Sequence, residues 1–94
     1  MDLKPATRQA LSNWIISSWD SDIEHDDDKR RFHLFVDQYQ RDHGFSVDQA
    51  GLREEIKRTA HAKGLPFGED QEGLAYDHAS RVYCILEFLK DTKS

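Results

Sequence analysis

Histidine is the first residue type to suggest chemistry, because the chain of 94 residues contains five of them. Zinc is bound by imidazole nitrogens, and a helix brings two ligands together when they stand three or four positions apart. No two histidines are that close, and on a predicted helix the pair at a spacing of four is His33 with Asp37. Two ligands do not complete a metal site. We therefore expect no metal and no other cofactor.

Cys84 is the single cysteine of the chain. A nucleophilic cysteine needs a lowered thiol pKa, which a helix N-terminus or a nearby cation provides. Cys84 instead stands inside the apolar stretch 82–86, so we expect it to be buried and structural. The sequence also lacks a Gly-rich phosphate loop and a nucleophile elbow. These features predict a protein that is not an enzyme.

Carboxylates are concentrated in one short segment of a chain whose net charge is −5. The segment is not an EF-hand loop, because counting from Asp20 puts His25 where the loop needs glycine and Arg31 where it needs glutamate. Acidic side chains next to an aromatic residue are typical of a surface that docks on a basic partner. The predicted partner-binding residues are Trp19, Asp20, Asp22, Glu24, Asp26, Asp27 and Asp28.

Basic residues line one face of a later predicted helix, which gives an alternative hypothesis. Arg53, Lys57 and His61 follow one another at a spacing of four, and Arg58 stands beside them. Such a face could contact DNA in a small nucleic-acid-associated regulator. The negative net charge, and two glutamates on the same helix, argue against this alternative.

Helix-breaking and helix-capping residues divide the chain into four predicted helices. The first covers about 5–19 and the second begins near Asp26 and ends at Gly44. The third begins after Ser46, which forms a capping box with Gln49, and it stops at Gly64. The fourth covers about 70–90. A buried strand over 82–89 is the alternative reading of its apolar stretch.

The fourth predicted helix has the widest apolar face. Its stripe contains His78, Val82 and Ile85, while Tyr76 and Phe88 widen it, so we expect this helix to lie at the centre of the fold. The predicted fold class is all-α, a compact four-helix bundle in a single domain covering 1–94. The role of His78 stays open.

Together, these features predict a small acidic, non-catalytic protein that binds a partner. Its partner is expected to be another protein with a basic surface, as for inhibitors, immunity proteins or phage- and plasmid-type accessory factors. A second copy of the chain stays an open alternative. No apolar run approaches the ~18 residues of a membrane span, and no apolar leader follows Met1. With one cysteine, this predicts a cytoplasmic protein without a membrane partner.

Overall fold

The computed structural model describes residues 2–19, 25–66 and 68–93. Within these ranges the chain forms no strand and four helices, in agreement with the predicted all-α four-helix fold. The predicted alternative, a strand over 82–89, is wrong because these residues lie in the middle of the last helix. The helices are α1 (Pro5–Trp19), α2 (His25–His43), α3 (Gln49–Ala62) and α4 (Glu69–Lys93).

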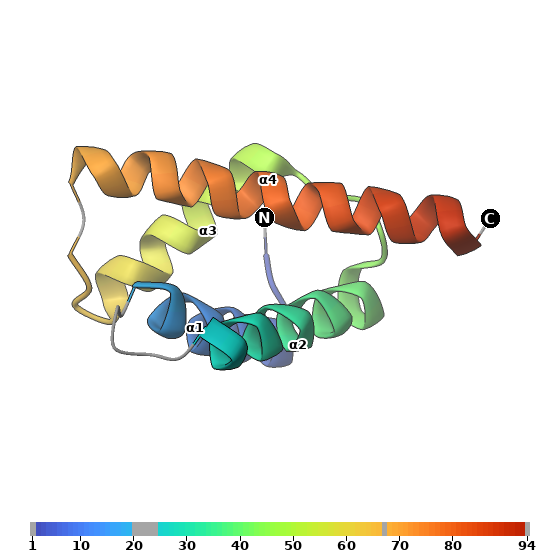
Figure 1. The fold of residues 1–94 in the computed structure, drawn as a ribbon, viewed down its shortest axis with the longest axis horizontal. Helices are drawn as coiled ribbons and strands as arrows, with labels where there is room; N and C mark the ends of the chain where they lie inside the picture. Colours follow the sequence, from blue (N-terminus) through green and yellow to red (C-terminus); the bar gives the residue numbers. More distant parts are fainter. Residues whose placement is uncertain (1, 20–24, 67, 94) are drawn as a thin grey trace.

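The helices form a two-sided bundle with α1 and α2 on one side and α4 on the other (Figure 1). α1 packs along α2, α4 packs on α3, and α3 also contacts α1. The longest helix, α4, runs along the length of the molecule, which measures 39 × 27 × 24 Å. The core therefore lies between the α1–α2 pair and the α3–α4 pair.

The start of α3 differs from the predicted one. Asp48, not Ser46, is the N-cap, and its carboxylate accepts a hydrogen bond from the backbone N–H of Gly51 at 3.0 Å. Ser46 lies before the helix, where its backbone carbonyl accepts a hydrogen bond from the hydroxyl of Tyr39 at 2.7 Å. Both residue types cap helices well. The Tyr39 contact holds the chain at Ser46 outside the helix, so the capping box is wrong by two positions.

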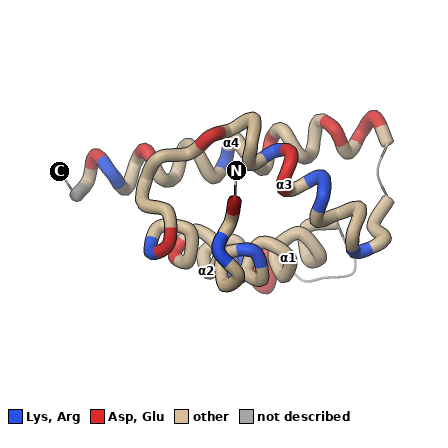
Figure 2. The backbone as a smooth tube through the Cα atoms, turned by 180° about the vertical axis from the view of Figure 1, so that it is seen from behind, with Lys and Arg blue, Asp and Glu red and all other residues tan. Residues whose placement is uncertain are grey.

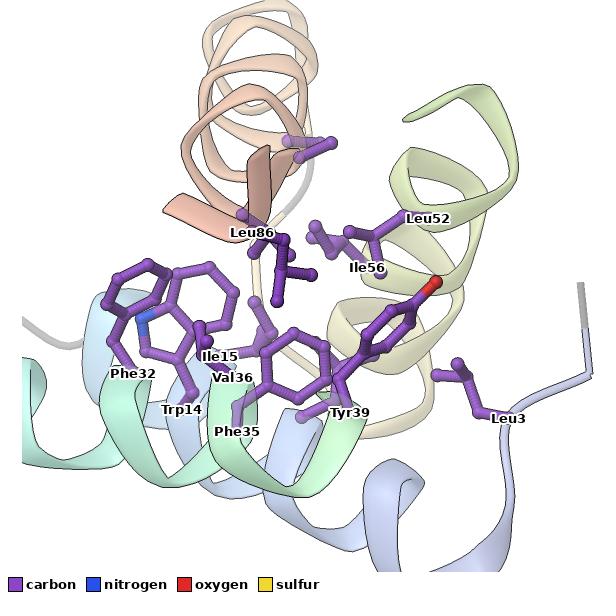
Figure 3. Close-up of a cluster of buried hydrophobic side chains, with 14 of the residues drawn as sticks. Leu3, Trp14, Ile15, Phe32, Phe35, Val36, Tyr39, Leu52, Ile56 and Leu86 are labelled. Carbon is purple, nitrogen blue, oxygen red and sulfur yellow. The ribbon is translucent and has the colours of Figure 1, made fainter. Parts of the chain in front are cut away.

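The indole ring of Trp14 is fully buried in the core, where it lies beside Phe32 (Figure 3). It stacks on Phe35 with the ring centroids 5.6 Å apart, and it meets Phe32 at a tilt with the centroids 4.9 Å apart. The imidazole of His78 stacks on it from α4 at 4.8 Å. Three helices thus meet on one aromatic side chain.

Only one stripe of α4 is fully buried. It consists of Ala75, Ala79, Val82 and Leu86, while Ile85 is partly buried. The prediction that Tyr76 and Phe88 widen a buried face is wrong, since these side chains are 55% and 67% exposed. Cys84 is exposed as well, which corrects the expectation of a buried thiol. The reason is the position of α4, which forms one outer side of the bundle and is not enclosed by the other helices (Figure 1).

A buried ion pair joins α3 to α1. Glu55 is 1% exposed, and its carboxylate contacts the guanidinium of Arg8 at 2.8 Å and that of Arg58 at 3.0 Å. Both arginines reach solvent, so the charge of Glu55 is compensated without burying two cations. This carboxylate is a structural group that fixes how α1 crosses α3.

Candidate functional site

Trp19 is the aromatic residue of the predicted acidic docking patch. Its indole N–H donates a hydrogen bond to the backbone carbonyl of Pro66 at 3.1 Å, and its ring meets His78 edge-on at 5.5 Å. The side chain is half-buried and fastens the α3–α4 connection to the end of α1. Of the other predicted residues, Asp20, Asp22 and Glu24 lie outside the described residues.

The first turn of α2 contains the remaining carboxylates of the patch. Asp26 is exposed, but Asp27 forms ion pairs with Arg30 and, at 3.0 Å, with Arg31. The hydrogen bond from Arg30 is the main reason that the pKa of Asp27 lies below its ordinary value. Both oxygens of the Asp27 carboxylate are therefore paired with arginines of the same helix.

Asp28 connects α2 to the last turn of α1. Its carboxylate accepts hydrogen bonds from the hydroxyls of Ser17 at 3.0 Å and Ser18 at 2.7 Å. Asp28 therefore connects the two helices, and its predicted docking role stays a prediction.

We predict that Asp28→Ala lowers the free energy of unfolding by about 2 kcal/mol, because two hydrogen bonds to a charged acceptor are lost. The matched control is Asp26→Ala, which removes only an exposed charge near the helix N-terminus and should cost about 0.3–1 kcal/mol. Urea denaturation measures both. Equal losses would show that the serine contacts add nothing to the interaction of a carboxylate with the helix dipole.

Two side chains of the predicted basic face of α3, Lys57 and Arg58, form ion pairs with carboxylates of the protein. The Nζ of Lys57 lies 2.9 Å from the Glu72 carboxylate on α4 and 3.5 Å from that of Glu54. Arg58 pairs with the buried Glu55, and His61 is exposed. The structure therefore does not bring Arg53, Lys57, Arg58 and His61 together as one cationic surface.

Arg53 lies at a small hollow between α3 and α4. The hollow has a volume of about 190 Å³ and is lined by Gln49, Ala50, Arg53, Tyr76 and Ala79. The Nε of Arg53 is buried there with no hydrogen-bond partner among the described residues. A buried donor without an acceptor is unfavourable, so this N–H is a cost to the folded state.

The side of α4 that faces away from the core combines exposed aromatic rings with carboxylates. Tyr76 and Phe88 are twelve residues apart, which is about 18 Å along a helix. The guanidinium of Arg81 is directed away from this side, since it lies 4.0 Å from the ring centroid of Phe32. We call this surface the α4 outer face; it consists of Tyr76, Asp77, Ser80, Cys84, Glu87, Phe88 and Asp91.

Figure 2 shows acidic residues along α4, with several of them near its start. Within the α4 outer face three residues carry carboxylates and none is a lysine or arginine. The sequence held a signal for this surface, because Asp77 and Glu87 directly neighbour the two exposed rings. A carboxylate directly beside each ring indicates that this side of the helix contacts water and not the core.

His78 belongs to the core and not to a reactive site. Its Nδ1 lies 2.8 Å from the backbone carbonyl of Leu74, and its ring is covered by Trp14 and Trp19. Burial lowers the pKa of His78 below the ordinary value of about 6.5, although the Leu74 carbonyl acts in the opposite direction. At neutral pH the imidazole is therefore uncharged.

We predict that this histidine makes the fold acid-sensitive. The unfolded chain takes up a proton at His78 near pH 6.5, while the folded chain does so only at lower pH. The stability of the native protein is therefore complete above about pH 6.5 and falls as the pH drops through the folded pKa. His78→Phe keeps the ring stacking and removes this dependence. The loss of Tm between pH 7 and pH 5 should be smaller in the variant, and an equal loss would contradict this role.

The described residues contain neither a candidate metal site nor a candidate membrane span. Their His, Cys, Asp and Glu side chains form no group of three or more that could hold a metal ion. His33 and Asp37, the pair singled out by their spacing, are both exposed on α2. None of the described helices has the length and apolar character needed to cross a membrane.

Comparisons with known proteins give no relative from which a role could be transferred. The chain matches no protein-family model, no curated protein and no solved structure. Its function has to be inferred from its own residues.

Proposed function

We propose that this chain is a small, non-catalytic protein that docks on a basic surface of another protein through the α4 outer face. The observation that carries the proposal is the exposure of Tyr76 and Phe88. They are two of the three large hydrophobic side chains that are exposed in the described part of the chain, and they share one helix.

Aromatic side chains supply much of the binding energy of protein interfaces. Each buries about 150–250 Å² when it is covered, and burial contributes about 25 cal/mol per Å² of apolar surface. The hollow beside Tyr76 has room for a side chain of the partner. An anchor residue in a pocket next to an aromatic ring is a common centre of an interface.

The charge of the partner follows from the carboxylates of the same face. Asp77, Glu87 and Asp91 accompany the rings, so a partner with lysines or arginines gains attraction during encounter. Two copies of this face would bring carboxylates against carboxylates, which disfavours pairing of the chain with itself here. Nucleic acid is disfavoured for the same reason.

The proposal can be tested with a model partner of the stated chemistry. The probe is a fluorescein-labelled helical peptide of 14 residues, with leucines on one face and lysines on the other. Fluorescence anisotropy measures its Kd for the native protein and for Tyr76→Ala/Phe88→Ala. We expect the double variant to bind at least tenfold more weakly, because both aromatic contacts are lost.

Leu34→Ala is the matched control, since Leu34 is 50% exposed but lies on α2. It should change the Kd less than twofold. A charge variant, Asp77→Asn/Asp91→Asn, should weaken binding at low salt, with a difference that shrinks as salt rises. Equal effects of the aromatic pair and of Leu34, or no binding by the native protein, would contradict the proposal.

A further inference from the structure

A groove runs between α1 and α2, and its charge is opposite to that of the chain as a whole. Its volume is about 460 Å³. Ala6, Ala10 and Leu34 give it an apolar floor, and its lining contains no carboxylate and no aromatic ring among the described residues. The polar lining consists of Gln9, Asn13, Arg30, Arg31, Gln38 and Arg41.

The groove lies on the far side of both helices from the core. A helix turns 100° per residue, so Gln9 and Asn13 stand opposite the buried Leu11 and Ile15 on α1. On α2 the lining residues likewise stand opposite the buried aromatic stripe. Because α4 covers the core from the other side (Figure 1), the groove and the α4 outer face point in opposite directions.

Contacts within the protein hold arginines at the two ends of the groove. Arg30 and Arg41 are eleven residues apart on α2, about 16 Å along nearly the same face. At one end Arg31 donates a hydrogen bond to the backbone carbonyl of Asn13 at 3.1 Å, while Asp27 pairs with both Arg30 and Arg31. Two guanidinium groups share the Asp27 carboxylate, so these three side chains together carry a net positive charge.

At the other end of the groove, the guanidinium of Arg41 bonds, among the described residues, only to the backbone of its own helix. Its Nε donates to the carbonyl of Asp37 at 3.4 Å, and no carboxylate within the described residues pairs with it. Guanidinium groups bind carboxylates with two parallel hydrogen bonds, which makes arginine well suited to recognise them. The groove thus offers cations at both ends and an apolar floor between them.

We propose that the α1–α2 groove binds an acidic peptide segment of a protein. An extended chain spans about 3.3–3.6 Å per residue, so about five residues cover the distance from Arg30 to Arg41. The segment carries carboxylates at both ends and an apolar side chain between them, which contacts Leu34. This inference goes beyond the proposed function, because it gives the molecule a second binding face of opposite charge.

A nucleic acid is the less suitable occupant of this groove. Proteins that hold single strands stack the bases on aromatic rings, and none of the described residues that line the groove is aromatic. A chain of net charge −5 also repels a polyphosphate more strongly than a short peptide with a few carboxylates.

The test uses a fluorescein-labelled peptide of seven residues with two glutamates at each end and a leucine at the centre. A second peptide has glutamine in place of every glutamate. Anisotropy titrations of the intact protein should show binding of the acidic peptide and not of the neutral one. Arg30→Gln/Arg41→Gln should raise the Kd at least tenfold. The control Lys63→Gln/Lys90→Gln removes the same charge from two residues that do not line the groove and should change the Kd less than twofold.

A third variant protects the test against a folding defect, since Arg30 also pairs with Asp27. Leu34→Glu alters a half-exposed residue, so the fold is retained while a carboxylate is placed on the groove floor. Binding of the acidic peptide should then be lost, whereas Leu34→Gln should keep most of it. Equal Kd values for the arginine and lysine variants would overturn the proposal. Tighter binding of a ten-nucleotide single-stranded DNA, lost in the arginine variant, would overturn it in favour of nucleic acid.

Discussion

Replacing Trp14 by alanine is expected to lower the free energy of unfolding by about 3–5 kcal/mol, the range for removing a large aromatic side chain from a core. The indole is fully buried and contacts rings from α2 and α4. Because a domain of this size is stable by only about 5–15 kcal/mol, the variant should unfold at much lower urea concentration.

Trp14→Phe is the informative companion to this variant. The indole N–H is buried with no acceptor among the described residues, so phenylalanine loses volume but no hydrogen bond. We expect a cost of about 1–2 kcal/mol, well below that of alanine. Similar losses for the two variants would show that the ring does not join the helices through packing.

The second large effect is expected at Leu86, which is fully buried on α4. Leu86→Ala should cost about 2–5 kcal/mol, since a cavity forms where α4 faces the core. Ile85 was predicted from the sequence to lie on the buried face, but it is only partly buried. Ile85→Ala should therefore lower the free energy of unfolding less than Leu86→Ala does. Urea denaturation of both variants measures the difference. The reverse order would mean that α4 faces the core with a different side.

Much of the fold could be predicted from short-range features of the sequence. Pro5 sits in the first turn of α1, and Gly64 follows α3 with a φ of +69°, a conformation that glycine adopts at little cost. These signals act within a few residues and do not depend on the rest of the molecule. The bounds of α1 and the end of α3 consequently agree with the expectation.

The environment of α4 could not be predicted in this way. Helical spacing shows which residues share a face, but it does not show how many neighbours cover the helix. Phe88 and Cys84 were therefore expected inside, although α4 forms an outer side of the bundle. Long-range contacts were missed for the same reason: Asp28 with Ser17, and Glu55 with Arg8, join residues that are distant in the sequence.

The two candidate binding faces differ in how visible they are in the sequence. The α4 outer face lies on one helix, so its aromatic and acidic residues could be placed together from their spacing. The α1–α2 groove combines Gln9 and Asn13 of one helix with Arg30 and Arg41 of another. The positive charge of the groove is hidden in the sequence, because Arg30 and Arg31 closely follow the aspartates 26–28.

The most direct test of the α4 outer face uses Cys84, the single thiol of the chain and an exposed one. Its alkylation rate is measured with and without a saturating amount of the lysine–leucine peptide. The control is Cys84→Ser/Leu34→Cys, which moves the thiol to α2. The proposed function predicts that the peptide slows alkylation of Cys84 at least fivefold and leaves the control thiol unaffected. An unchanged rate at Cys84, or equal protection of both thiols, would contradict it.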